Sequence, residues 1–341
     1  MRYLWNLKIV IFLSFFIIML FVMASYFSDT EKEPSKVILL WTSFFGEKDY
    51  ISPLKNLHCE RQDCVITSNR NMLKNSDAII FHLRDMNLED LPDFRLSNQR
   101  WVMLHHESPP HTPNTLTSLE GFFNWSATYR RDSDIFLSPV VTPLKKAVLK
   151  QQDFHKEKSL LAVWFASNCI TPSNREVYVR ELQQAVPVDV YGSCGDRECL
   201  PKMSTKCYKE ASQKYFFYLA FENSMCKDYI TEKFFNVLDT DMVPVVLGGA
   251  DYTQFAPPNS FINALDFSSP QHLGKYLQNV ARNATLYNKF LEWKQYFKLE
   301  QTHYACDICK KLHDHNEPVK IYHNLYNWWF IEANCKSWTT E

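Results

Sequence analysis

The chain has 341 residues, which is long enough for about two domains of ordinary size and for a large buried core. Its 37 basic and 38 acidic residues give a formal net charge of −1, and this balance indicates neither a nucleic-acid partner nor a strongly charged protein partner. Aromatic residues make up 15% of the chain, with 9 tryptophans, which is typical of a large aromatic core and also of proteins that stack sugars on aromatic rings.

The first feature along the chain is an uncharged apolar segment at residues 9–27. Its length is close to the roughly 20 residues that a helix needs to cross a bilayer. Arg2 and Lys8 precede the segment and Asp29 follows it, so the positive-inside rule places residues 1–8 in the cytosol. A cleaved signal peptide is the alternative, but its apolar core is usually only about 7–15 residues long. We predict a signal anchor at residues 9–27 and a single-pass type II protein.

Beyond a short polar stem at residues 28–36, short apolar runs alternate with polar or helical connections. The runs of the first half lie at residues 37–40, 64–67, 78–81 and 101–104. This alternation is typical of strands in a parallel sheet with helical crossovers. It predicts a first α/β domain over residues 37–150.

A second α/β domain is predicted over residues 151–341, and its most informative segment follows an aromatic strand at residues 215–221. Polar residues come next, then a helix that we expect to begin at Asp228, then a buried strand at residues 243–247. Ligands of doubly wound sheets bind at the carboxyl ends of strands, where helix N-termini favour anions. Lys233 lies close to that first helical turn. The C-terminal part, residues 291–338, is predicted to be helical.

The chain has 10 cysteines, and this number indicates disulfides in an oxidising compartment. Cys59 with Cys64, and Cys306 with Cys309, are spaced to close short loops, although spacing does not settle connectivity. A zinc site at the second pair, with His313 and His315 nearby, is a weaker alternative because a second Cys-x-x-Cys is absent.

Two kinds of short motif need separate interpretation. Asn124 and Asn283 stand in Asn-x-Ser/Thr sequons, which predict N-glycosylation of exposed sites. Two Asp-x-Asp motifs begin at Asp132 and at Asp239, and such motifs hold metal in some transferases. We interpret both as structural, with Arg130 and Arg131 as ion-pair partners of the first, and we predict no metal site.

Several longer motifs occur together and in order. They are WVMLHHESP at residues 101–109, FNWSATYRRDSDI at 123–135, ENSMCKDYITEKFF at 222–235, VPVVLGG at 243–249, and a late Cys-x-x-Cys. Together they resemble the Golgi α1,3-fucosyltransferases over about residues 36–338. The resemblance implies a GT-B architecture, in which two Rossmann-like domains face a cleft, and a Golgi membrane protein with a lumenal catalytic part. It also implies GDP-fucose as donor, with no required metal cofactor and a divalent cation (Mn²⁺ or Mg²⁺) only as a stimulant.

The same resemblance implies roles for individual residues. Glu107, at the end of a predicted strand, would be the general base that removes a proton from the acceptor hydroxyl. Arg175 and Lys233 would bind the donor diphosphate. The remaining candidates are Glu232 for a ribose hydroxyl, Asn223 and Tyr229 as further lining of the donor pocket, and His106 on the acceptor side.

Each of these residues also has an ordinary interpretation. Glu107 stands before two prolines and fits a surface turn, while Glu232 and Lys233 fit an exposed helix face. Arg175 fits a solvated helix position, with Arg180 as a rival for the phosphates.

The expected reaction is inverting transfer of L-fucose to O3 of a GlcNAc on N-glycans. The segments YGSCGDREC at residues 191–199 and CDICKKLHD at 306–314 favour the innermost, core GlcNAc. Antenna (Lewis-type) fucosylation, transfer to a protein hydroxyl, and a catalytically silent Golgi glycan-binding member are the alternatives.

Overall fold

The computed structural model describes Met19 and residues 35–51, 56–57, 59–148, 152–201, 204–301 and 303–339. The chain divides into two compact units, residues 1–35 and 36–341, and the second unit is the subject below. The predicted membrane helix at residues 9–27 lies outside the described residues except for Met19. Within the described ranges, no helix combines the length and the apolarity that spanning a membrane requires.

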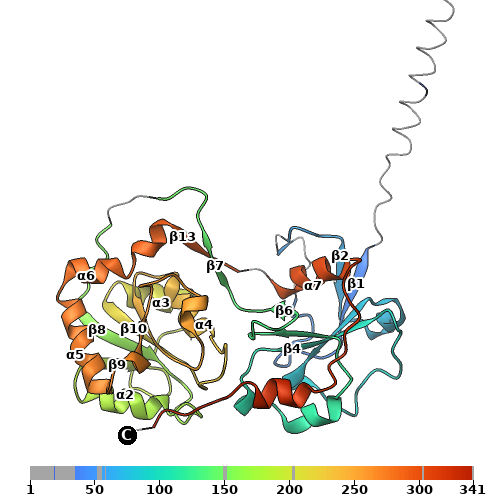
Figure 1. Cartoon of the computed structure of the whole chain (residues 1–341), viewed down its shortest axis with the longest axis horizontal. Helices are drawn as coiled ribbons and strands as arrows, with labels where there is room; N and C mark the ends of the chain where they lie inside the picture. The colour runs from blue at the N-terminus through green and yellow to red at the C-terminus, as the bar shows by residue number, and fades with distance from the viewer. Residues whose placement is uncertain are drawn as a thin grey trace, which may run out of the picture. The chain divides into compact units, whose positions relative to one another are not determined.

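Six of the described strands form a parallel sheet in the order β2-β1-β3-β4-β5-β6 (Figure 1). They are β1 (Lys36–Leu40), β2 (Cys64–Thr67), β3 (Ala78–His82), β4 (Arg100–His105), β5 (Trp125–Thr128) and β6 (Ile135–Phe136). The central strand β3 reads AIIFH and is buried along its whole length, as expected of a strand covered on both faces. Short helices η2 (Arg70–Asn75), η3 (Leu83–Asp85), η4 (Pro109–His111) and η5 (Asn114–Leu119) connect these strands.

A second parallel sheet has the order β12-β11-β10-β8-β9 among the described strands. They are β8 (Leu160–Phe165), β9 (Val188–Tyr191), β10 (Tyr215–Phe221), β11 (Val243–Leu247) and β12 (Ile262–Asn263). All seven residues of β10 are buried, which confirms the predicted aromatic strand.

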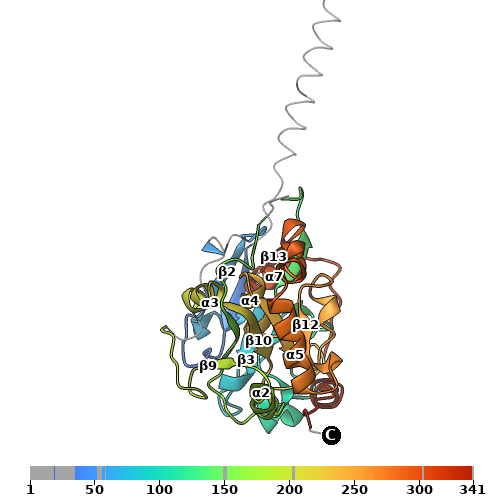
Figure 2. The same cartoon turned by 90° about the vertical axis from the view of Figure 1, so that its left-hand side faces the viewer.

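Helices cover both faces of the second sheet. On one face, α2 (Arg175–Gln183) and α5 (Pro270–Ala281) share a buried core with residues of β10 such as Phe217 and Leu219. On the other face, α3 (Thr205–Ser212) and α4 (Glu232–Leu238) pack with Tyr218 and Ala220. Figure 2 shows α3 and α4 on one side of β10 and α5 on the other.

In each of the two sheets, the strand order along the chain reverses at one point. In the first sheet the chain leaves β1 for β2 on one side and returns to β3 on the other, and in the second sheet the same happens around β8, β9 and β10. In open α/β sheets, ligands bind beside the carboxyl ends of the two strands at this switch point. In the second sheet those strands are β8 and β10.

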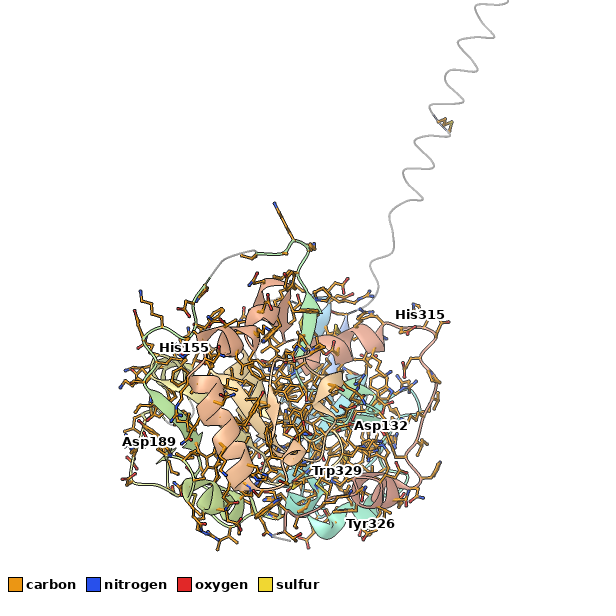
Figure 3. The ribbon with its side chains drawn as sticks, turned by 60° about the vertical axis from the view of Figure 1, so that its left-hand side comes forward. Asp132, His155, Asp189, His315, Tyr326 and Trp329 are labelled. Atoms are coloured by element: carbon orange, nitrogen blue, oxygen red, sulfur yellow. A yellow bond between two sulfur atoms is a disulfide. The ribbon has the colours of Figure 1, made fainter. Side chains whose placement is uncertain are left out.

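The C-terminal part is only partly helical. After α6 (Ala284–Lys289), it contains η8 (Glu292–Gln295), β13 (Phe297–Glu300), α7 (Tyr304–Leu312) and η9 (Asn327–Ile331), and β13 pairs antiparallel with β7 (Val140–Pro143). Although α7 follows the second sheet in sequence, Ala305 and Ile308 pack with residues of the first sheet, such as Ile80. Trp329, labelled in Figure 3, is fully buried in the core on the other face of the first sheet.

The observed disulfides differ from the short loops that the cysteine spacing suggested. The described cysteines pair as Cys59–Cys306, Cys64–Cys309, Cys169–Cys194, Cys199–Cys207 and Cys226–Cys335. The first two join segments 247 and 245 residues apart and attach α7 to the first sheet. The sulfurs of the suggested zinc site are therefore in disulfides and are not thiolates, so the zinc alternative is wrong for these cysteines.

The two sequons differ in their surroundings. Asn124 is 2% exposed, and its amide nitrogen donates to the Lys320 carbonyl over 2.8 Å while its oxygen accepts from the Trp101 N–H. A glycan at this nitrogen does not fit the folded structure, so the prediction for Asn124 is wrong. Asn283 is exposed at the N-cap of α6, and its glycosylation stays a prediction.

Candidate functional site

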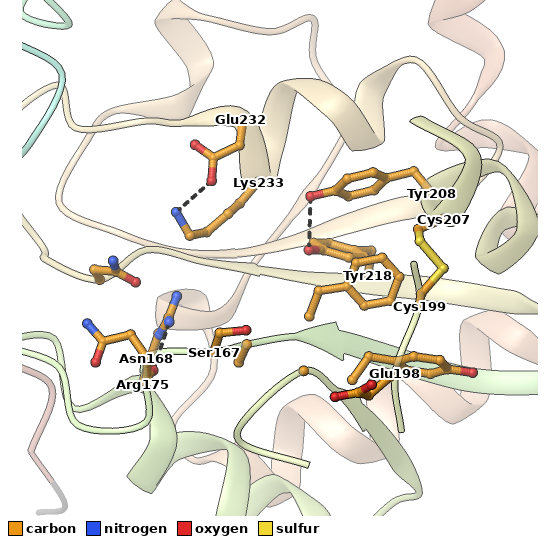
Figure 4. A pocket seen from close by; sticks show the side chains of 15 residues that line it. Ser167, Asn168, Arg175, Glu198, Cys199, Cys207, Tyr208, Tyr218, Glu232 and Lys233 are labelled. Carbon is orange, nitrogen blue, oxygen red and sulfur yellow. Dashed lines mark hydrogen bonds and ion pairs between the residues drawn. A yellow bond between two sulfur atoms is a disulfide. The ribbon is translucent and has the colours of Figure 1, made fainter. Parts of the chain in front are cut away.

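A pocket opens at the carboxyl ends of β8 and β10, at the switch point of the second sheet (Figure 4). Four of the predicted site residues line it: Arg175, Asn223, Glu232 and Lys233. The other lining residues are Phe165, Ala166, Ser167, Asn168, Tyr191, Gly192, Glu198, Cys199, Cys207, Tyr208 and Tyr218. Its volume is about 190 Å³. Small-molecule sites usually hold roughly 300–1,000 Å³, so a larger ligand would extend beyond it.

Arg175 is the first residue of α2 and is 2% exposed. Its guanidinium donates to the Phe221 carbonyl over 2.6 Å and to the Asn168 carbonyl over 3.1 Å, and it lies 5.3 Å from the ring of Trp164. Burial lowers its pKa. No carboxylate of the described residues forms an ion pair with it, and its Nε is buried without a partner there. Arg175 is thus a buried cation whose charge a bound anion would balance.

The helix after β10 begins later than predicted. It starts at Glu232, with Thr231 as N-cap, because the Thr231 side chain accepts from the Lys233 N–H. Asp228 instead has a φ of +61° and accepts a hydrogen bond from the Arg131 N–H over 3.2 Å. Lys233, predicted to lie close to the first helical turn, lies within it.

Lys233 is held by two carboxylates. Its Nζ lies 3.2 Å from Glu222 Oε2 and 3.2 Å from Glu232 Oε1, and it donates to Thr231 Oγ1 over 2.8 Å. Burial opposes the charged form of Lys233, but the two carboxylates outweigh burial and raise its pKa. The positive charge of Arg175 acts in the opposite direction, so the two cations are near neighbours.

Glu222 is the site residue that the sequence interpretation missed. It is fully buried at the end of β10, burial raises its pKa, and it accepts from the Thr231 N–H over 2.8 Å. It fixes both the N-cap of α4 and the ammonium group of Lys233. The available signal was a carboxylate directly after a buried strand, a costly location unless the charge is paired.

The other two donor-side candidates have different outcomes. Asn223 lines the pocket, and its Oδ1 is buried without a hydrogen-bond partner among the described residues. Tyr229 does not line the pocket, because it is 3% exposed and packs edge-on against Tyr129 at 4.8 Å in the core that includes Trp329. Beyond burial, the charges of Glu107 and Glu232 nevertheless act on Tyr229 and help to raise its pKa, so its part in the donor site stays a prediction.

Glu107 follows β4 and is near the pocket although it does not line it. Its carboxylate is about a quarter exposed, 3.7 Å from the Arg84 guanidinium. Its negative charge helps to raise the pKa of the buried Tyr229, after burial itself and Glu222. The next residue, Ser108, donates to Ser224 over 2.8 Å. The loop with Glu107 is thereby joined to the loop after β10.

His106 lies beside Glu107 and faces an aromatic group. Its ring is 5.4 Å from Phe44 and 6.3 Å from Tyr304. Burial lowers its pKa to about 4, in spite of the nearby carboxylate of Glu232, so the imidazole is neutral at pH 7. Its Nδ1 is buried without a partner in the described part of the chain. His106 is thus suited to hydrogen bonding and not to carrying charge.

The Asp-x-Asp motifs are occupied by structural contacts. Asp132 pairs with Arg130 at 2.6 Å, and Asp134 accepts from Tyr322 over 2.8 Å and pairs with Lys320 at 3.0 Å. Asp241 pairs with Lys294 at 3.5 Å. The expected role of Arg131 is wrong, because its guanidinium bonds to Gln254 and not to Asp132.

Comparison with known proteins agrees with this arrangement. Residues 155–328 match the model "Glycosyltransferase family 10 (fucosyltransferase) C-term", and residues 33–139 match "Fucosyltransferase, N-terminal". The chain belongs to glycosyltransferase family 10. Its curated relatives are α1,3-fucosyltransferases, so it is a member of an enzyme family whose reaction is fucosyl transfer.

Individual relatives show how far the likeness extends. The chain is 35% identical to α-(1,3)-fucosyltransferase C of Drosophila melanogaster over 89% of its own length and 80% of that protein. It is 37% identical to glycoprotein 3-α-L-fucosyltransferase A of the same organism, over 82% and 57%. It is 34% identical to 4-galactosyl-N-acetylglucosaminide 3-α-L-fucosyltransferase 9 of Rattus norvegicus, over 89% and 83%.

A solved structure shares the fold. The crystal structure of an α1,3-fucosyltransferase with GDP-fucose superimposes with a TM-score of 0.56 and 18% sequence identity, covering 85% of this chain and 93% of that one. This likeness concerns the arrangement of the α/β elements.

Proposed function

We propose that this protein transfers L-fucose from GDP-β-L-fucose to O3 of a GlcNAc residue on N-glycans, with inversion at the sugar carbon. One observation carries the proposal: the buried Arg175 and the partly buried Lys233 are two cations in one pocket at the switch point of the second sheet. Such a pair suits the diphosphate of a nucleotide sugar. A carboxylate, Glu107, stands on the loop that is joined to this site.

In the donor complex, the diphosphate oxygens accept hydrogen bonds from Arg175 and Lys233. Lys233 exchanges its contact with the half-exposed Glu232 for one with phosphate, while the buried Glu222 keeps holding it. Glu232 is then free to accept from a ribose hydroxyl, and the unpartnered Oδ1 of Asn223 accepts a further donor hydrogen bond. Because the pocket holds only about 190 Å³, the fucose extends out of it toward Glu107.

Glu107 is the general base of the proposed step. As the acceptor O3 attacks C1 of fucose, its proton passes to the Glu107 carboxylate, and the C1–O bond breaks with its electron pair leaving on the β-phosphate of GDP. One displacement of this kind converts a β donor into an α product. Neutral His106 supplies a hydrogen-bonding group beside the incoming acceptor.

The wider arrangement is also proposed. Residues 37–150 would form the acceptor-side domain and residues 151–341 the donor domain of a GT-B enzyme, whose cleft holds the reacting atoms. Residues 9–27 would anchor the protein in the Golgi membrane as a type II protein, with the catalytic part and an N-glycan at Asn283 in the lumen. The two protein cations would make a metal unnecessary for chemistry, with a divalent cation only stimulating it.

The acceptor is proposed as the core GlcNAc. The glycoprotein 3-α-L-fucosyltransferase of Drosophila melanogaster, one of the relatives, supports this choice, whereas the 4-galactosyl-N-acetylglucosaminide enzymes support an antenna acceptor. Protein hydroxyls remain a third acceptor class, and a silent glycan-binding protein is the non-enzymatic alternative.

One experiment separates these functions. The full-length protein is incubated with GDP-fucose and defined glycans that carry only a core GlcNAc, only an antenna N-acetyllactosamine, or neither, together with a deglycosylated protein. Mass spectrometry should show one added deoxyhexose on the core substrate, lost when the core GlcNAc is removed. Addition only to antennae would assign the antenna GlcNAc as the acceptor in place of the core GlcNAc. No addition to any substrate would favour a catalytically silent glycan-binding protein.

A further inference from the structure

The donor pocket has two chemically different ends. Figure 4 shows Arg175, Lys233 and Glu232 toward one end, while Glu198 lies toward the other, near the Cys199–Cys207 disulfide. One end therefore offers positive charge, and the far end offers a carboxylate.

The direction in which a nucleotide sugar lies follows from the acceptor loop. Ser108, next to Glu107, donates to Ser224 over 2.8 Å, and Ser224 is next to the pocket residue Asn223. The charge of Glu232 also acts on His106, which is adjacent to Glu107, so we take the cationic end as the end nearest to the base. With phosphates at Arg175 and Lys233 and fucose directed to Glu107, the nucleoside points toward Glu198. This step rests on the proposed function.

The segment that carries Glu198 is firmly held. The Gly192 N–H donates to the Arg197 carbonyl over 2.8 Å, and the Cys194 N–H donates to the Ala166 carbonyl over 3.0 Å. Gly192 has a φ of +98°, and a Cβ there would lie 2.6 Å from the Ala166 oxygen, so only glycine permits this close approach to β8. Two disulfides, Cys169–Cys194 and Cys199–Cys207, fix both sides of the loop. The backbone that carries the exposed Glu198 side chain is thus held in place on the pocket wall.

This carboxylate also has no competing partner. Its neighbour Arg197 pairs with Asp189 at 3.1 Å, and no residue in the described part of the chain forms a hydrogen bond or ion pair with Glu198. An ionised carboxylate on a pocket wall accepts hydrogen bonds and donates none. A ligand edge that meets it must present N–H or O–H donors. Because the proposed site gives the ribose hydroxyl to Glu232, the base is left to supply N–H groups at Glu198.

Guanine presents such an edge. Its N1–H and its 2-amino group are adjacent donors, whereas adenine and cytosine combine a donor with an acceptor and uracil flanks one N–H with two carbonyls. We propose that Glu198 accepts both guanine N–H groups and thereby selects guanine as the nucleobase of the donor. Paired hydrogen bonds to a charged carboxylate give strength and geometric selectivity together.

Calorimetric titration of the full-length protein tests the assignment with three nucleotides. GDP carries both donors, inosine diphosphate lacks the 2-amino group, and xanthosine diphosphate has a carbonyl in its place. The wild type should bind GDP at least about tenfold more tightly than either analogue, as expected for the loss of one charge-assisted bond.

Glu198→Gln keeps the shape but replaces one acceptor oxygen with an amide donor. GDP affinity should fall about tenfold to a hundredfold, while xanthosine diphosphate, whose carbonyl accepts from the new amide, should bind more tightly than it does to the wild type. Asp196→Asn is the matched control, because Asp196 is an exposed carboxylate of the same loop that does not line the pocket. It should leave all three affinities unchanged.

The outcomes separate this inference from the proposed function. If the wild type binds no GDP, the donor assignment itself is wrong. If it binds GDP but Glu198→Gln keeps the wild-type preference among the three nucleotides, Glu198 does not read the base. Pyrophosphate contacts only the cationic end, so its unchanged affinity in Glu198→Gln shows that the variant pocket is folded. A uniform loss that includes pyrophosphate would count against a role limited to the base.

Discussion

Ser108 donates a hydrogen bond from its hydroxyl to that of Ser224 over 2.8 Å, and both side chains are fully buried. Ser108 follows Glu107 after β4 of the first sheet, and Ser224 follows Asn223 after β10 of the second. One short contact therefore joins the loop of the proposed base to the loop of the proposed donor site, across 116 residues of sequence.

Ser108→Ala and Ser224→Ala should each destabilise the protein by about 1–3 kcal/mol, because each leaves a buried hydroxyl without its partner. The double variant should cost less than the sum of the two, as expected for residues in contact. Both single variants should lower kcat while GDP affinity stays constant, because Glu107 loses a fixed neighbour. Ser260→Ala, which removes a buried hydroxyl elsewhere, should lose stability without losing kcat. If the double variant lost as much stability as the two single variants together, Ser108 and Ser224 would not be energetically coupled.

Arg175→Ala and Lys233→Ala should each weaken GDP binding by about 1.5–3 kcal/mol, or roughly 10- to 150-fold, by removing a charged donor to phosphate. Calorimetry provides the measurement, and Arg180→Ala, at an exposed position of the same helix, provides the control. Lys233→Ala should also lower stability, since it leaves Glu222 buried without its cation. Wild-type GDP affinity in both variants would remove these two residues from the donor site.

Transfer activity should persist after exhaustive chelation. The proposed site stabilises the leaving diphosphate with Arg175 and Lys233, while Asp132 and Asp134 are engaged by Arg130 and Lys320. The rate is measured with GDP-fucose and acceptor after dialysis against EDTA, and again after adding Mn²⁺. A modest increase on addition agrees with stimulation. Activity that disappears in EDTA and returns only with Mn²⁺ would establish a metal-dependent reaction.

The sequence could predict what depends on local pattern. The buried strand at residues 215–221 and the location of Lys233 close to a first helical turn follow from runs of neighbouring residues, and the structure confirms them. Tyr229 packs against Tyr129, a hundred residues away, and no local pattern indicates this contact. The same reason applies to Cys59 and Cys306, whose pairing depends on α7 returning to the first sheet.

Glu198 and Glu222 show which site residues local sequence could not predict. Neither belongs to a periodic pattern. Glu198 lines the pocket in a segment held by disulfides, and the buried Glu222 holds Lys233 and the N-cap of α4. Asn124 shows the reverse case, in which a correct motif lies at a buried position. Burial and long-range pairing are properties of the folded chain, so local sequence did not reveal them.

The free energy of unfolding should fall as the pH drops from about 6.5 to 4. His106 has a pKa of about 4 in the folded state, lowered mainly by burial, against 6.5 as a free side chain. The unfolded state therefore binds more protons in this window, which makes stability rise with pH there. The shift corresponds to about 3 kcal/mol for complete titration. Denaturant titrations at several pH values give the free energy of unfolding as a function of pH. This free energy should depend less steeply on pH in His106→Gln than in the wild type. If the free energy of unfolding depended on pH equally in both proteins, His106 would not be the source of this pH dependence.

Glu107→Gln should fold, bind GDP as the wild type does, and lose most of its transfer activity. Glutamine keeps the size of the side chain and a hydrogen-bonding oxygen, but it cannot take the proton from the acceptor hydroxyl. Loss of a general base typically slows a reaction about 10²- to 10⁴-fold, or roughly 3–5 kcal/mol in the barrier. The loss should appear in kcat and not in donor affinity, because the proton moves only in the transition state.

Glu89→Gln, which changes an exposed carboxylate elsewhere on the acceptor-side half, should keep full activity. If Glu107→Gln retained more than about a third of the wild-type kcat, far above that range, another group would have to accept the proton. His106, the adjacent hydrogen-bonding residue, would be the next to test.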